Sequence, residues 1–177
     1  MRYISAATLA LSAFLTSCAV MSKEPVPTVP HVDLPRFMGA WYVIASIPTF
    51  LEKDAYNAVE AYRLEPDGTI ATTFTFRKGS LQGPLKTMRP RGWTRDASNA
   101  VWGMQFIWPI KAEYLIAHIN DEYTETIIAR NARDYVWIMA RTTAVSDADY
   151  QRLVARVERL GYDTAKLRRV PQSWPQN

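Results

Sequence analysis

The sequence contains only one cysteine, Cys18, in 177 residues. A single thiol cannot form a disulfide within the chain, so a folded domain must be held together by packing alone. Histidine is also scarce. His31 and His118 lie far apart in the sequence, without a cluster of Cys, Asp or Glu at ligand spacing. This composition argues against a metal site.

Charge of one sign is not in large excess, since 21 Lys and Arg oppose 17 Asp and Glu to give a net charge of +4. Without a dense basic stripe, a nucleic-acid partner is not expected. Recognised catalytic motifs are missing too, because there is no Gly-x-Ser-x-Gly elbow, no phosphate-binding loop and no pairing of His with Ser or Cys. We therefore expect a protein that is not an enzyme and has no cofactor.

Long apolar runs are also missing, and the longest lies near the start. Residues 4–15 (ISAATLALSAFL) carry no charge and follow Arg2. This run is too short to span a bilayer, which needs about 20 residues. A basic start, a short apolar segment and small residues before a cleavage point are typical of a secretory signal peptide. We assign residues 1–17 to this peptide.

The segment that follows, Leu15-Thr16-Ser17-Cys18, resembles the lipobox of bacterial lipoproteins. In that family the cysteine sulfur is lipidated, the chain is cut just before it, and the new amino terminus takes an acyl chain such as palmitate. The resemblance implies a lipid anchor at Cys18. Because residue 19 is Ala and not Asp, it also implies the outer membrane, with the domain facing the periplasm. A buried cysteine in an ordinary helix is the alternative.

The chain after the lipobox divides into a tether and one domain. Residues 18–35 are rich in proline, which predicts an extended, semi-rigid tether. Residues 36–177 have the length of a single domain.

Short β-rich runs separated by turns dominate this domain, with Pro66-Asp67-Gly68 as the clearest turn. Their spacing predicts an antiparallel barrel or sandwich, and the sequential hairpins favour an up-and-down barrel. The eight predicted strands cover residues 41–48, 57–65, 69–77, 84–95, 100–107, 112–119, 123–130 and 135–142.

One helix is predicted after the strands. Ser146 is a natural N-cap, and Gly161 ends the pattern. Its apolar face is expected to pack against the sheet, although a membrane-surface helix would have a similar pattern. That face consists of Tyr150, Leu153, Val154, Val157 and Leu160.

Large apolar residues occupy alternate positions of several strands, so they share the inward face. An eight-stranded barrel is just wide enough to be filled by side chains or to hold one small ligand. These residues therefore either fill the core or line a ligand pocket. The candidate ligand-binding residues are Tyr62, Phe74, Phe76, Trp102, Met104, Phe106, Tyr135, Trp137 and Met139.

Three positions resemble the lipocalin family. Gly39 and Trp41 match its Gly-x-Trp signature, and Arg141 matches an arginine that ends the last strand. In lipocalins this arginine stacks over the tryptophan and closes the barrel base. Residues 133–167 resemble in particular the bacterial lipocalins, which are outer-membrane lipoproteins related to apolipoprotein D. The likeness covers about residues 34–170, although residues 119–123 match the family only loosely.

The resemblance implies an eight-stranded barrel that is closed by Arg141 and open at the other end. Four segments would then surround the mouth: 48–57, 77–84, 107–112 and 130–134. Arg77, Lys78 and Lys111 would be placed to bind a phosphate or carboxylate headgroup.

The expected function is that of a lipid-binding outer-membrane lipoprotein that stores or carries fatty acids, lysophospholipids or similar amphiphiles. The alternatives are a structural envelope lipoprotein with a filled barrel and a lipid-modifying enzyme. Bacterial lipocalins form dimers, so the resemblance also allows a homodimer.

Overall fold

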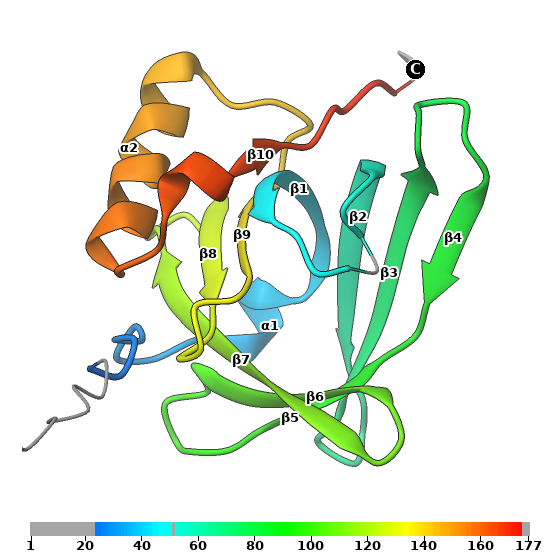
Figure 1. The fold of residues 1–177 in the computed structure, drawn as a ribbon. Coiled ribbons are helices and arrows are strands. Elements are labelled where there is room, and N and C mark those ends of the chain that lie inside the picture. Colours follow the sequence, from blue (N-terminus) through cyan, green and yellow to red (C-terminus); the bar gives the residue numbers. More distant parts are fainter. Residues whose placement is uncertain (1–23, 51, 175–177) are drawn as a thin grey trace, which may run out of the picture.

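The computed structural model describes residues 24–50 and 52–174. The predicted signal peptide and Cys18 lie outside the described residues. A ten-stranded antiparallel sheet closes on itself, because β1 pairs with both β2 and β9 (Figure 1). The strands are β1 (Gly39–Ile47), β2 (Ala55–Leu64), β3 (Ile70–Lys78), β4 (Leu85–Met88), β5 (Arg91–Thr94), β6 (Val101–Ile107), β7 (Ile110–Ile119), β8 (Glu125–Ala129), β9 (Val136–Ala140) and β10 (Arg168–Arg169).

The predicted barrel is confirmed, with two strands more than expected. The run at 84–95 is two strands, β4 and β5, because Pro90 has no backbone N–H to continue the ladder. Both pieces still pair with β3, so the wall stays continuous. The tenth strand, β10, pairs with β1 at Ala45 and Ser46, beyond the residues of β1 that pair with β2.

The inward face of the strands holds the main core, as the alternating pattern predicts. On β3, Ile70, Phe74 and Phe76 are all buried and belong to the cluster inside the barrel. The outward residues Ile127 of β8 and Ile138 of β9 belong to a second cluster under the helix. The barrel therefore has a core inside its wall and another against one side of it.

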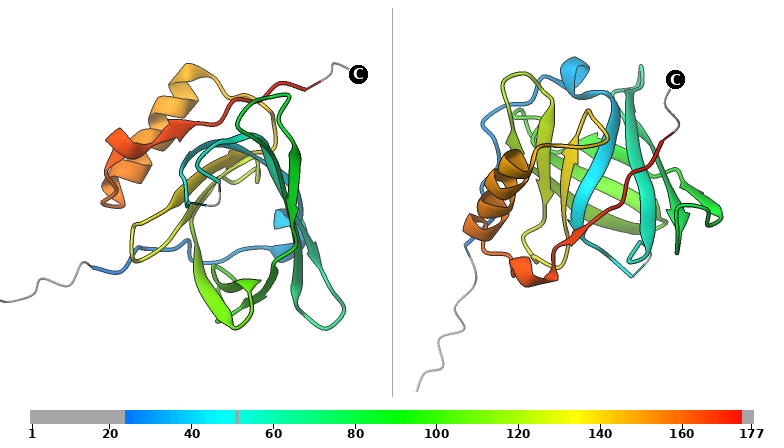
Figure 2. Two further views of the ribbon diagram at one scale, coloured as in Figure 1. Left: turned by 45° about the vertical axis from the view of Figure 1, so that its right-hand side comes forward. Right: turned by 90° about the horizontal axis from the view of Figure 1, so that it is seen from above.

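The helix α2 (Asp147–Arg159) lies across the outside of the barrel wall (Figures 1 and 2). Leu153 and Val157 are fully buried against the outward residues of the strands, which is the predicted packing. The alternative of a membrane-surface helix is wrong, because this apolar face is already covered. The remaining short helices are α1 (Leu34–Phe37) and a 3-10 turn, η1 (Thr164–Lys166).

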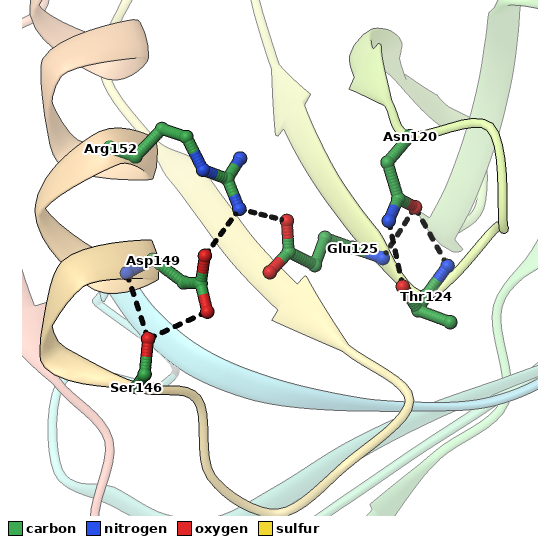
Figure 3. A network of polar contacts seen from close by, with 6 residues as sticks. All are labelled: Asn120, Thr124, Glu125, Ser146, Asp149 and Arg152. Atoms are coloured by element: carbon green, nitrogen blue, oxygen red, sulfur yellow. Dashed lines mark hydrogen bonds and ion pairs between the residues drawn. The ribbon is translucent and has the colours of Figure 1, made fainter.

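Polar contacts fix the start of α2 to the barrel (Figure 3). The Ser146 hydroxyl accepts a hydrogen bond from the backbone N–H of Asp149 at 3.1 Å. Arg152 then forms ion pairs with Asp149, at 2.9 Å, and with Glu125 of β8, at 2.7 Å. One arginine therefore links the first turn of the helix to the strand beneath it.

The segment from Glu24 to Asp33 does not stand clear of the barrel, contrary to the predicted tether over residues 18–35. Val26 and Val32 are buried, and the backbone N–H of Val29 donates to Ile116 at 3.0 Å. Apolar residues alternate with the prolines here, and their burial outweighs the tendency of proline-rich chain to stay extended in solvent. Residues 24–33 are therefore part of the folded domain.

Candidate functional site

The barrel contains a cavity near one of its ends. A cavity of about 430 Å³ lies where β1 leads into β2 and β8 into β9. This volume falls within the range of small-molecule sites, about 300–1,000 Å³. The lining residues are Pro48, Thr49, Phe50, Glu52, Glu60, Phe74, Met88, Phe106, Ala112, Arg130, Asp134, Tyr135 and Trp137.

Only some of the nine predicted ligand-binding residues line this cavity. Phe74, Phe106, Tyr135 and Trp137 line the cavity. Phe74 lies on β3 and Phe106 on β6, while Tyr135 directly precedes β9 and Trp137 lies on it. Closure of the barrel therefore brings together residues that are far apart in the sequence. The other five are not among its lining residues: Tyr62, Phe76, Trp102, Met104 and Met139.

Tyr62 and Trp102 form an aromatic layer with Phe37 below the cavity. The ring of Phe37 lies 5.5 Å from that of Tyr62 and 5.3 Å from that of Trp102, centroid to centroid. Tyr62 and Trp102 meet edge to face at 5.6 Å. Aromatic edges and faces attract each other in this arrangement. The layer fills the closed half of the barrel, beneath the residues that line the cavity.

Arg141 closes the base beneath this layer. Its guanidinium lies 3.8 Å from the ring centroid of Trp41 and donates hydrogen bonds to the carbonyls of Ala40 and Met38, both at 2.8 Å. Gly39 has a φ of +92°, and a Cβ at this position would lie 3.3 Å from the arginine. The Gly-x-Trp pattern therefore leaves room for the arginine over the tryptophan.

Glu60 is the main feature of the cavity that the sequence analysis missed. It faces inward from β2, directly opposite Phe74 of β3, and is 1% exposed. Burial raises the pKa of Glu60 to about 8, and the charge of Glu52 adds to this shift, while a hydrogen bond with Tyr62 opposes it. The sequence could have predicted this position, because Glu60 lies two residues before the inward-facing Tyr62 on the same strand and so points to the same face.

Glu52 places a second carboxyl group at the same cavity. Its Oε1 accepts a hydrogen bond from the Thr49 hydroxyl at 2.9 Å, and its Oε2 accepts one from the Trp137 indole N–H at 3.2 Å. Burial raises the pKa of Glu52, and its hydrogen bonds with Thr49 and Trp137 oppose that shift. Glu52 therefore ties the segment after β1 to the cavity wall.

The charged residues at the mouth differ from those expected. Arg130 and Asp134 line the cavity and pair at 3.1 Å. Arg77 donates to the backbone of Gly83, and Lys111 lies over the ring of Trp93, while Lys78 is not among the lining residues. The predicted headgroup site at these three cations is therefore not part of the cavity.

Two further findings concern only residues 24–50 and 52–174. No group of three His, Cys, Asp or Glu side chains there is arranged to hold a metal ion. No helix in this part of the chain is both long enough and apolar enough to cross a membrane.

Comparisons with known proteins agree with this geometry. The family model described as a Lipocalin-like domain matches residues 32–172. Temperature-induced lipocalin-1 of Arabidopsis thaliana is 30% identical over 158 residues, which cover 85% of this chain and 85% of the relative. Outer membrane lipoprotein Blc of Citrobacter freundii is 28% identical over 169 residues, which cover 94% of this chain and 96% of the relative.

A solved structure shows the same fold. Insecticyanin from the tobacco hornworm Manduca sexta matches with a TM-score of 0.66 and 15% identity, over 84% of this chain and 85% of that chain. A closed antiparallel barrel with a sealed base, a hollow end and a helix on its wall defines a class of small β-barrel proteins that hold ligands inside. The chain belongs to the lipocalin family, and its likeness to the Citrobacter lipoprotein confirms the resemblance to the bacterial lipocalins.

Proposed function

We propose that this protein is a lipid-binding lipoprotein of the outer membrane that stores or carries an amphiphile in the barrel cavity. The ligand is an amphiphile with one long apolar chain, such as a fatty acid, a lysophospholipid or a similar molecule. No reaction takes place at the site, and binding is the partition of the apolar chain from water into the barrel. Each buried CH₂ group contributes about 0.8 kcal/mol.

The observation that carries this proposal is the contrast between the two halves of the barrel. The closed half is filled by large side chains such as Trp41 and Trp102, which are fully buried. The open half keeps a cavity of about 430 Å³ with Phe74 and Phe106 on its walls. Packed interiors leave few voids larger than a water molecule, so a hollow of this size inside a well-packed barrel supports a ligand site.

The membrane location is supported by two independent features. The lipobox ends at Cys18, and a lipid there would anchor the chain. A relative similar over 94% of this chain is named an outer membrane lipoprotein. In this arrangement the barrel sits in the periplasm, close to its lipid source.

A titration of the purified full chain with a fluorescent fatty acid tests the binding function. We expect saturable binding at one site and its displacement by unlabelled fatty acid or lysophospholipid. Ala112→Trp, which adds volume to a lining residue, should weaken binding about tenfold or more. Ala97→Trp, on an exposed turn, is the matched control and should leave binding unchanged.

The same titration separates the competing functions. Absence of saturable binding by the folded protein would favour a structural lipoprotein. Chemical conversion of the bound lipid, measured by mass spectrometry over repeated turnovers, would favour an enzyme.

A further inference from the structure

The floor of the cavity presents a polar atom without a partner. Glu60 is 1% exposed, and its Oε1 has no hydrogen-bond partner among the described residues. Glu60 lies between Trp41 on one neighbouring strand and Phe74 on the other, so its surroundings on the wall are apolar. A buried polar group left unpaired costs free energy, and such groups in native proteins call for an explanation. A ligand that brings a donor to this atom would supply one.

Among the described residues that line the cavity, no cation is free to pair with Glu60. Glu52, the second buried carboxyl group at the cavity, is engaged by Thr49 and Trp137. The Tyr62 hydroxyl contacts the Glu60 carboxyl group and also hydrogen-bonds to the Tyr114 hydroxyl, yet Oε1 of Glu60 stays without a partner among the described residues. At the mouth, Tyr135 donates to the Glu113 carbonyl at 2.6 Å. Within residues 24–50 and 52–174, Arg130 is the only cation that lines the cavity, and it is paired with Asp134.

We propose that the cavity prefers an amphiphile whose polar end is a protonated amine, and that Glu60 binds this ammonium group at the floor. This inference rests on the proposed function and names the ligand class of the same cavity. An ammonium group has three donors and no acceptor, so it can supply the donor that Oε1 of Glu60 lacks. A ligand carboxylate in the same place would bring no donor, and a hydroxyl would form only a neutral hydrogen bond.

The proposed orientation also fits the walls above the floor. With the amine at Glu60, the alkyl chain runs past Phe106 and Trp137 towards the mouth. Phe50 lines the mouth and is 83% exposed, so an emerging chain would cover it. The apolar residues would then bind the tail and the acidic floor would select the head.

Burial of an ammonium group is costly by itself. The preference for an amine therefore depends on ionisation of the Glu60 carboxyl group. Glu60, with its pKa near 8, is largely protonated in the empty cavity at neutral pH. When a protonated amine binds, Glu60 gives its proton to solvent and pairs with the ligand. Hydrogen bonds to charged groups are about twice as strong as neutral ones, which sets the expected preference at about tenfold or more.

The test compares three ligands with the same chain: dodecylamine, dodecanol and dodecanoic acid. Calorimetric titration of the purified full chain, below the concentration at which these molecules aggregate, gives each affinity at neutral pH. We expect dodecylamine to bind about tenfold or more tightly than dodecanol, and dodecanoic acid to bind weakest. Glu60→Gln should remove the preference for the amine and change dodecanol binding little. Glu122→Gln, at the exposed turn between β7 and β8, is the matched control and should keep it.

Repetition of the amine titration in buffers of different ionisation enthalpy keeps the test valid if Glu60→Gln does not fold. We expect release of close to one proton on binding of the amine and none on binding of the alcohol. Equal affinities for the three ligands, or an amine preference that survives Glu60→Gln without proton release, would overturn the inference while leaving the proposed function intact. Failure of all three to bind would instead count against the proposed function.

Discussion

At the scale of single residues, the unusual feature is a carboxyl group inside an apolar barrel. Alternation along β2 turns Glu60 inward, to a position where an apolar residue would be expected. An acid can be buried there at neutral pH because its protonated form carries no charge to desolvate. The residue therefore has a clear cost for stability at high pH, which can be measured.

The pH dependence of stability should report on Glu60. Its pKa is about 8 in the folded protein, above the value of 4.5 in an unfolded chain. The folded state therefore holds the proton more tightly. The free energy of unfolding should fall as the pH rises from about 4.5 to about 8, by roughly 1 kcal/mol per pH unit.

Glu60→Gln removes this ionisable group. The free energy of unfolding of the variant should therefore rise relative to that of the wild type as the pH increases from about 4.5 to about 8. Urea unfolding at several pH values gives the comparison. Glu158→Gln, an exposed glutamate on α2, is the control and should follow the wild type. Parallel pH profiles for wild type and Glu60→Gln would show that Glu60 does not titrate in this way.

Arg141 should contribute stability without touching the ligand. Arg141→Ala removes the guanidinium over Trp41 and leaves the carbonyls of Ala40 and Met38 without their donor. We expect a loss of about 2 kcal/mol or more in the free energy of unfolding, seen as a lower Tm, with unchanged ligand preference. Arg63→Ala, at an exposed ion pair, should have little effect. Loss of binding in an equally stable Arg141→Ala protein would make Arg141 a ligand residue.

At the scale of elements, the sequence predicted the strands and the helix because their patterns are local. Alternation with a period of two and the N-cap at Ser146 depend on neighbouring residues only. The packing of residues 24–33 could not be predicted in this way. It depends on distant partners, such as Asn131, whose side-chain oxygen accepts a hydrogen bond from the Val26 N–H at 2.6 Å.

The start of α2 should be sensitive to its cap. Ser146→Ala removes the oxygen that accepts from the N–H of Asp149, so we expect a loss of about 1 kcal/mol in the free energy of unfolding. Ser146→Asp keeps an acceptor at the same place and should retain most of the stability. Chemical denaturation measures both. Equal destabilisation by Ala and Asp would show that the cap bond is not the cause.

At the scale of the whole molecule, the site was only partly predictable. Parity alone placed Phe74, Phe106, Tyr135 and Trp137 inside the barrel, where they line the cavity. The alternation of inward and outward residues does not predict the depth to which the barrel is filled. That depth depends on how Phe37 of α1 packs against Tyr62 and Trp102 of the wall. Glu60 was missed because inward positions were searched for apolar residues only, and Glu52 was missed because it lies in the turn between β1 and β2, where no alternation applies.

Membrane attachment of the molecule should depend on Cys18. Cys18→Ala removes the only sulfur that can be lipidated, so the folded protein should move from the membrane fraction to the soluble fraction. Fractionation followed by immunoblotting measures this change. The variant needs a cleavable signal sequence as control, so that an uncut leader does not hold it in the membrane. Retention in the membrane with that leader removed would contradict the anchor.

The central claim is that the hollow end of the barrel receives the ligand chain, and Trp137 tests it most directly. Trp137 lines the cavity and donates its indole N–H to Glu52. The decisive measurement is the affinity of the fluorescent fatty acid for wild type, Trp137→Phe and Trp137→Arg, once each variant shows a native circular dichroism spectrum.

We expect Trp137→Phe to bind with moderately reduced affinity, because most of the apolar volume remains. Trp137→Arg should bind about a hundredfold more weakly or not at all, because its guanidinium would occupy the cavity and pair with the buried carboxyl groups. Equal affinities in all three proteins would place the ligand outside the cavity and contradict the account.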